Sequence, residues 1–149
     1  MSDTAVELAT LRTELKDLTD RAEITRLCDR YTHNLDLNRD NDAWLDSVFT
    51  EDAYLIFPMG EYRGMDGLKQ FQDMARKTFE TTHHISSNYD INLAGDRAEV
   101  TAHLQAIHVH RTDDPETHFG IGGHYTAETV RTEDGWRIRK FNFTLVWRA

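Results

Sequence analysis

The chain has 149 residues and a mass of 17.3 kDa, the size of one ordinary domain that buries its own core. Acidic residues outnumber basic ones by 26 to 17, and the resulting net charge of -9 disfavours a nucleic-acid partner or an anionic membrane surface. A single cysteine, Cys28, excludes an internal disulfide framework, and no apolar run approaches the roughly 20 residues of a membrane helix. Because the N-terminal segment lacks the basic and apolar regions of a signal peptide, we expect a cytoplasmic protein.

The first half of the chain has the apolar periodicity of helices. A helix is predicted over residues 5–18 from four leucines spaced three and four apart: Leu8, Leu11, Leu15 and Leu18. A capping-box pattern formed by Asp20 and Glu23 predicts the start of a second helix over residues 20–36. Further helices are predicted over residues 42–49 and 66–79.

The remaining segments have the composition of strands. A short hairpin is predicted at residues 53–57 and 61–63, and four long strands at residues 83–93, 97–111, 119–132 and 136–147. Helices that precede a run of strands indicate an α+β fold and not alternating βαβ units. We therefore expect a single domain over residues 1–149. It is a cone-shaped barrel of strongly twisted antiparallel sheet packed against three to four helices, with residues 1–18 peripheral and a pocket inside.

Two residues could form a general base. Asp36 ends the predicted helix 20–36, where an anion is poorly placed unless it has a hydrogen-bonding or cationic partner. His84 opens the first long strand, and a carboxylate beside a histidine orients the ring and raises its basicity. Either residue could instead be an ordinary surface group, so the residues by themselves leave this pair open.

Several other polar residues could either take part in a functional site or have a purely structural role. Tyr31 lies on the apolar face of the second helix, where its phenol could be a core group or a hydrogen-bond donor to an oxyanion. His108 and His110 alternate on one strand and could line the pocket. With His124 they could hold a metal, but no further ligand has a suitable spacing. The glycines at 120, 122 and 123 lack the spacing of a phosphate loop and indicate a bulge or a close backbone approach.

Several short motifs, in order and spacing, resemble the nuclear-transport-factor-2-like superfamily and, within it, the SnoaL-like group. The resemblance covers about residues 18–147. It rests on DRAEI at 20–24 with Tyr31, FTEDA at 49–53, YRG at 62–64, HISSN at 84–88, GGHY at 122–125 and DGWRI at 134–138. The resemblance implies the cone fold described above.

Within that group, scytalone dehydratase, the bile-acid 7α-dehydratases and hexachlorocyclohexane dehydrochlorinase use an Asp–His pair in the cone. The corresponding positions here are Asp36 and His84, and Tyr31 matches a tyrosine of the bile-acid enzymes. Phe141 stands near the position of the dehydrochlorinase arginine that would receive a halide, so the resemblance argues against dehydrohalogenation. Leu145 and Ala106 likewise replace charged residues of the bile-acid enzymes, and a bile-acid substrate is not supported.

The function expected from the sequence is a lyase of the dehydratase type or an isomerase or cyclase. It would act without a cofactor on a small, largely apolar cyclic or polyketide-like substrate. His84 would take a proton, Asp36 would hold His84, and Tyr31 with a second histidine would hydrogen-bond or protonate the leaving oxygen. The expected substrate contacts are Trp44, Tyr54, Phe57, Asn88, His108, His110, His124 and Phe141.

Two other functions stay open. The same fold could serve as a non-catalytic module that binds a small ligand or supports assembly, because fold does not determine function. A metal enzyme based on His108, His110 and His124 is the weaker alternative. A homodimer or homotrimer is expected by analogy, through an outer sheet face that carries Ile107 and Val109.

Overall fold

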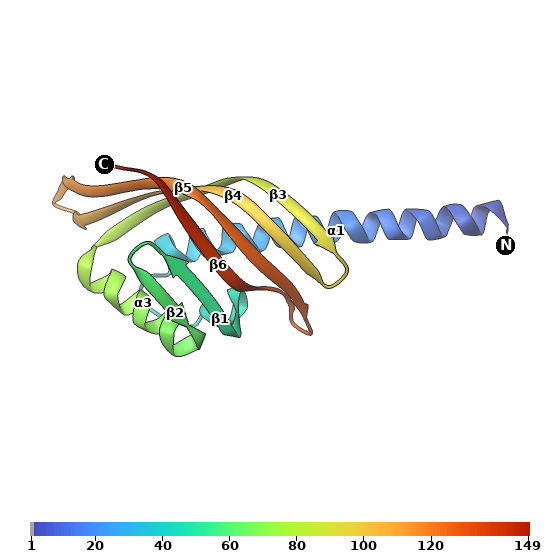
Figure 1. Cartoon of the computed structure of the whole chain (residues 1–149), viewed down its shortest axis with the longest axis horizontal. Helices are drawn as coiled ribbons and strands as arrows, with labels where there is room; N and C mark the ends of the chain where they lie inside the picture. Colours follow the sequence, from blue (N-terminus) through green and yellow to red (C-terminus); the bar gives the residue numbers. More distant parts are fainter. Residues whose placement is uncertain (1) are drawn as a thin grey trace.

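A computed structural model describes residues 2–149, in which three helices pack against one strongly curved sheet (Figure 1). The helices are α1 (Asp3–Leu37), α2 (Leu45–Val48) and α3 (Gly64–Thr78). The strands are β1 (Phe49–Phe57), β2 (Gly60–Arg63), β3 (Thr81–Ala94), β4 (Arg97–Arg111), β5 (Asp114–Thr132) and β6 (Gly135–Arg148). The helices precede or interrupt a run of long strands, which confirms the α+β class.

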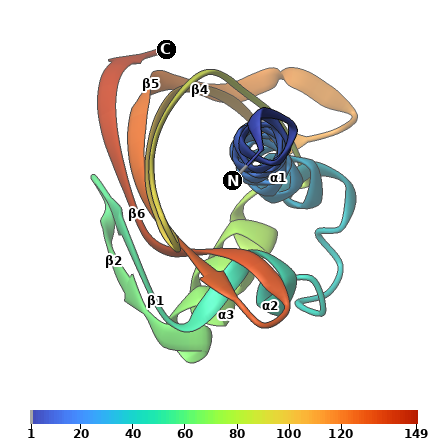
Figure 2. The ribbon, with the colours of Figure 1, turned by 90° about the vertical axis from the view of Figure 1, so that its right-hand side faces the viewer.

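The structure confirms the predicted strongly twisted, mostly antiparallel sheet packed against helices, and the two edges of this sheet do not close on each other. The strand order is β2-β1-β6-β5-β4-β3, and β2 and β3 are the two edges. All neighbours are antiparallel except β1 and β6, which run parallel. Figure 2 shows the sheet curving around one side of a space whose other side is occupied by α1 and α3. The helices thus complete the enclosure that the strands leave open.

A single helix, α1, replaces the two helices predicted over residues 5–18 and 20–36. Its N-cap is Ser2, whose Oγ accepts a hydrogen bond from the Ala5 amide at 3.2 Å. Asp20 caps nothing, because its carboxylate accepts hydrogen bonds from Arg131 on β5 at 2.8 and 2.7 Å. Lys16 also lies 3.2 Å from this carboxylate, and the side chain of Asp20 is only 5% exposed. The apparent capping box is therefore a buried ion pair that joins α1 to the sheet.

The core lies between the C-terminal half of α1 and the concave face of the sheet. On β4 the buried residues Val100, Ala102 and Leu104 alternate with exposed ones, as a strand with one covered face requires. From α1 the buried residues Ile24 and Leu27 pack against this face. The N-terminal half of α1 projects beyond the sheet in Figure 1. No helix within residues 2–149 is long and apolar enough to cross a membrane.

Two adjacent glycines of β5 allow β6 to pack closely, as the glycine run predicts. The register between these strands shifts between Gly122 and Gly123. A Cβ atom added at Gly123 would lie 2.0 Å from the backbone oxygen of Thr144, a distance that no side chain tolerates. The strand pairing at this bulge therefore depends on the absence of a side chain.

Alanine at Gly123 is expected to destabilise the fold by about 1–3 kcal/mol, because β6 must move to admit the new methyl group. The free energy of unfolding in urea measures this change. Gly120→Ala is the matched control, since its Cβ would lie 3.1 Å from the flexible end of Ile107. Equal stabilities of the two variants would contradict the close approach at Gly123.

Candidate active site

A cavity opens between the concave face of the sheet and the two longer helices. It holds about 610 Å³ of empty space, including the solvent at its mouth. Most of its wall is apolar, contributed by Leu35, Phe57, Met59, Phe71, Ala75, Leu104, Ala106, Ile121 and Phe143. Six polar side chains also reach it: Tyr31, Arg39, Gln72, Thr82, His84 and His108. An apolar pocket with a few convergent polar groups is typical of ligand and active sites.

Asp36 and His84 meet at the wall of this cavity. Asp36 lies one residue before the end of α1, and His84 lies near the start of β3. His84 Nδ1 is 2.7 Å from Asp36 Oδ1, and the His84 backbone N–H donates to Asp36 Oδ2, also at 2.7 Å. The side chain of His84 is only 10% exposed and that of Asp36 15%, so little water competes for the contact. The structure therefore brings together two residues that are 48 positions apart in sequence.

The contacts of Asp36 favour its ionised form. Burial alone would raise the pKa of this carboxyl, but the hydrogen bonds from the His84 ring and backbone, with that from Thr82, outweigh burial and hold the pKa below its usual value. A carboxylate only accepts hydrogen bonds, so His84 Nδ1 carries the hydrogen, and in the neutral ring Nε2 has a lone pair. Because His84 lines the cavity and Asp36 does not, Nε2 is the atom of this pair available to a ligand.

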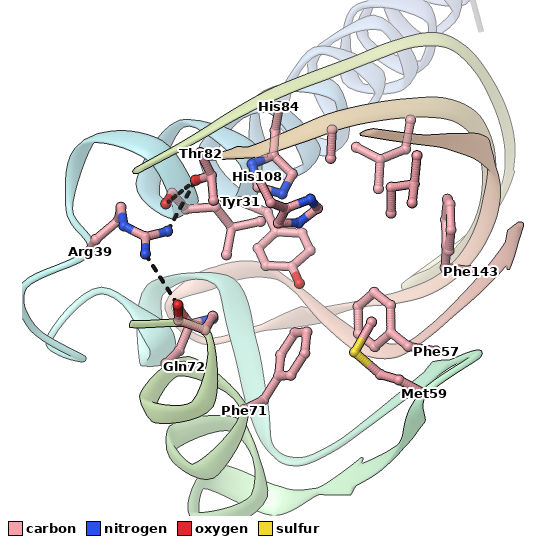
Figure 3. Close-up of a pocket in the computed structure, with 15 residues that line it drawn as sticks. Tyr31, Arg39, Phe57, Met59, Phe71, Gln72, Thr82, His84, His108 and Phe143 are labelled. Carbon is pink, nitrogen blue, oxygen red and sulfur yellow. Dashed lines mark hydrogen bonds between the residues drawn. The ribbon is translucent and has the colours of Figure 1, made fainter. Parts of the chain in front are cut away.

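Thr82 and Arg39 support the pair and were not predicted from the sequence. The hydroxyl of Thr82 lies 2.9 Å from Asp36 Oδ1 and accepts a hydrogen bond from Arg39 at 3.1 Å. Arg39 also donates to the backbone oxygen of Phe79 at 2.7 Å, which ties the loop after α1 to the end of α3. Figure 3 shows the guanidinium of Arg39 at one end of the cavity. Its only sequence signal was an arginine in a polar turn three residues after Asp36.

His108 is the second histidine of the cavity, and His110 is not. The rings of His108 and His84 meet edge to face with centroids 5.6 Å apart. His108 Nδ1 lies 3.2 Å from the backbone oxygen of Phe119, so Nδ1 carries the hydrogen and Nε2 is an acceptor. Burial, together with the nearby His84, lowers the pKa of His108 to about 4. His108 is therefore neutral at pH 7, and the predicted role as a proton donor is corrected to that of a hydrogen-bond acceptor.

Tyr31 and Gln72 supply hydrogen-bond donors. Tyr31 is 3% exposed, and its ring packs edge-on against Phe49 and Phe141 with centroids 5.1 and 5.3 Å apart. Its hydroxyl points into the cavity in Figure 3, and burial raises the pKa of this phenol, which keeps it protonated. Gln72, on α3, is 7% exposed and also lines the cavity. Within residues 2–149 neither side chain makes a hydrogen bond, so both are free for a ligand.

Six of the eight predicted substrate contacts do not line the cavity, whereas Phe57 and His108 do. Trp44 and Phe141 are buried behind Tyr31 and form its support instead of the wall. The other four lie outside the cavity: Tyr54 stacks under Arg63, Asn88 and His124 are exposed, and His110 packs against Phe79 beyond the cavity wall. For the residues on strands, the cause is that a strand's curvature and its cavity-facing side cannot be determined from its own sequence.

The histidines do not converge on a metal site. Among residues 2–149 no group of three or more histidine, cysteine, aspartate or glutamate side chains is arranged to hold a metal ion. His124 pairs with His103 on the outer face of the sheet, far from the cavity side of β4.

Burial raises the pKa of the Cys28 thiol to about 12, so this residue is not a nucleophile at neutral pH.

Comparison with known proteins agrees with this architecture. The sequence model described as the SnoaL-like domain matches residues 16–142, most of the chain. This chain belongs to the SnoaL-like family. The uncharacterized protein Rv2910c of Mycobacterium tuberculosis is 33% identical over 129 residues, which cover 82% of each chain.

Two solved structures show the same fold in proteins named as lyases. One, provisionally named a scytalone dehydratase, comes from Novosphingobium aromaticivorans. It has 23% sequence identity and a TM-score of 0.78, and the match covers 89% of this chain and 88% of that one. The other is the hexachlorocyclohexane dehydrochlorinase LinA-type3 of Novosphingobium barchaimii, with 19% identity, a TM-score of 0.78 and coverages of 91% and 92%. At these identities the similarity establishes the SnoaL-like fold, a fold that such enzymes use.

Proposed function

We propose that this SnoaL-like protein is a cofactor-independent lyase that removes water from a small, largely apolar cyclic hydroxy-carbonyl compound. The observation that carries the proposal is the Asp36–His84 pair, which places a histidine lone pair at the wall of an apolar cavity. The lyase names of the two structural neighbours support the same reaction class. Isomerisation or cyclisation of a similar substrate would use the same base.

His84 Nε2 takes a proton from the carbon next to the substrate carbonyl. The electrons of that C–H bond form the new C=C bond while the C–O bond to the leaving hydroxyl breaks. The hydroxyl departs as water after it receives a proton from the charged His84. Asp36 touches no substrate in this scheme and is a positioning residue that holds the ring and stabilises its charged form.

The cavity's other polar groups define which substrate oxygens fit. Tyr31 and Gln72 present donors and suit a carbonyl or leaving oxygen, whereas His108 Nε2 presents an acceptor. An apolar ligand would separate this acceptor from water and leave it without a partner, so the best ligand carries a hydroxyl group opposite His108. We infer a substrate with at least two oxygens on an apolar ring, one accepting and one donating a hydrogen bond.

Exchange of substrate hydrogens tests the base separately from the leaving group. In D₂O, the protein is expected to accelerate loss of the α-proton NMR signal of 1-tetralone, a cyclic ketone with no leaving group. A cyclic β-hydroxy ketone tests elimination, because the conjugated product absorbs in the ultraviolet. His84→Ala is expected to slow both reactions by about 10²–10⁴-fold while leaving ketone binding intact.

The alternative, a non-catalytic binding module, predicts a different result. The same ketones would then shift the NMR signals of cavity residues such as Phe57 without exchange or elimination. Proton exchange that persists in His84→Ala at the parent rate would also contradict the proposal, because another group would then be the base.

A further inference from the structure

The N-terminal half of α1 carries a row of leucines that are largely exposed. Leu8, Leu11, Leu15 and Leu18 are 47%, 60%, 65% and 65% exposed. Large apolar side chains exposed in a continuous row mark an interaction surface more often than an ordinary surface. The proposed function uses none of these residues, and this part of α1 extends beyond the sheet (Figure 1).

The leucine row cannot fold back onto its own domain. At 3.6 residues per turn, these leucines lie on the side of α1 nearly opposite to Ile24, Leu27 and Tyr31. Those three residues are buried against the sheet, so the leucine row faces away from it. The helix therefore has two apolar faces, one filled by the domain and one free for a separate partner.

The spacing of the row is that of a coiled coil. Leu8 and Leu15 take position a of a heptad, and Leu11 and Leu18 take position d. In the following heptads, Ala22 takes position a, Thr25 position d and Asp29 the next position a. The apolar row therefore ends after Leu18, because Thr25 and Asp29 are polar. It is therefore a short seam of about two heptads, defined here as the leucine seam, residues 8–18.

The charges beside the leucine seam select both the partner and its direction. Glu7 and Glu14 take position g, and Arg12 takes position e. In a parallel pair, position g of one helix faces position e five residues later in the other, so Glu7 meets Arg12 of the second copy. In an antiparallel pair g faces g, and the glutamates would repel. Neither Glu7 nor Arg12 has an ion pair within residues 2–149, so both are free for this contact.

We propose that the leucine seam pairs with the same segment of a second copy of this chain in a parallel, two-stranded coiled coil. The two domains sit on the outer sides of the pair, because each packs on the face of α1 opposite the seam. The entropic cost of forming the helix is already met, since residues 3–37 are one continuous helix anchored by the domain. The cavity and the Asp36–His84 pair lie outside the interface.

Sedimentation equilibrium of the full chain tests the pairing. The parent is expected to be a dimer at micromolar concentration. Leu11→Asp is expected to raise the dissociation constant by about 100-fold or more, because each dimer loses two buried leucines and gains two carboxylates in the seam. Val6→Asp is the matched control: Val6 is 51% exposed on the opposite side of the same segment, and its variant is expected to remain dimeric.

The direction is tested by charge exchange. Glu7→Arg alone is expected to weaken the dimer, and Glu7→Arg combined with Arg12→Glu is expected to restore it. A cysteine introduced by Leu8→Cys is expected to form a disulfide between copies under mild oxidation, since like a positions face each other only in a parallel pair. The native Cys28 is buried and does not interfere.

Three results would overturn the proposal. The first is a monomeric parent at 100 micromolar. The second is an oligomer that survives Leu11→Asp unchanged, which would assign association to another surface such as the exposed Val146 and Trp147 of β6. The third is a Leu8→Cys dimer that does not cross-link. Because the seam variants keep the domain intact, unchanged near-ultraviolet circular dichroism distinguishes lost pairing from unfolding.

Discussion

Alanine in place of His84 is expected to lower turnover of a substrate by about 10²–10⁴-fold, the contribution of a well-placed general base. Among the groups that line the cavity, only the ring of His84 is hydrogen-bonded to a carboxylate, that of Asp36. The ring of His108 is hydrogen-bonded to the neutral backbone carbonyl of Phe119 instead. Steady-state kinetics of dehydration measures the effect, with kcat falling and KM nearly unchanged. His83→Ala is the matched control, since this exposed neighbour points to the other face of β3 and its variant should keep full activity.

The Asp36→Asn variant tests whether Asp36 acts by positioning the His84 ring and stabilising its charged form. The amide keeps the shape of the carboxylate but removes its charge, so it no longer stabilises the charged ring of His84. We expect a smaller loss of kcat than in His84→Ala and an altered dependence of kcat on pH. A variant with the parent's pH profile would show that Asp36 has only a structural role.

Asparagine in place of Asp20 is expected to lower the free energy of unfolding by about 2–4 kcal/mol. The amide removes the buried negative charge beside Arg131 and offers one acceptor oxygen where the carboxylate offers two, so one of the two short hydrogen bonds from Arg131 is lost. Arg131 keeps its ion pair with the exposed Asp96 at 2.8 Å. Urea denaturation measures the change. Asp17→Asn is the control: its pair with Arg21 is 46% and 41% exposed, so its loss should cost less than about 1 kcal/mol. Similar effects of the two variants would contradict the structural role assigned to Asp20.

The same ion pair makes stability depend on pH in acid. The hydrogen bonds from Arg131 hold the pKa of Asp20 far below its ordinary value of 3.8, although burial opposes them. A carboxyl with a depressed pKa in the folded state adds stability above its ordinary pKa and loses it as the pH falls below that value. Between about pH 5 and pH 2 the parent should therefore lose stability more steeply than Asp20→Asn, as urea midpoints at each pH would record.

Most of the secondary structure could be predicted from the sequence. Each long strand follows from alternating apolar residues and a turn, and α3 follows from its own periodicity. The break predicted within α1 is wrong for a long-range reason. Asp20 resembles a cap because its partner Arg131 lies 111 residues away, and no local pattern contains that contact. The parallel pairing of β1 with β6 likewise joins opposite ends of the strand region, and no local pattern contains it.

The two residues of the candidate base could be predicted from the sequence, but the residues that surround them in the cavity could not. Asp36 and His84 followed from their positions relative to helix and strand ends, together with the resemblance to the SnoaL-like group. Thr82, Arg39 and Gln72 carry no signature, because a threonine, an arginine in a turn and a glutamine on a helix are ordinary in any chain. Only the packing of α1 against β3 and of α3 against β1 and β2 brings them to the cavity.

The sequence by itself determined the element types, the α+β class and the leucine seam, because these depend on periodicities within one segment. The tertiary structure decided which histidine faces the cavity, which tautomer each ring adopts and whether Asp20 is a cap or an ion pair. Those properties depend on distances between atoms that are remote in sequence: 48 residues separate Asp36 from His84, and 11 separate His108 from the carbonyl of Phe119. A donor or acceptor takes its chemical role from its neighbour, and only the fold supplies that neighbour.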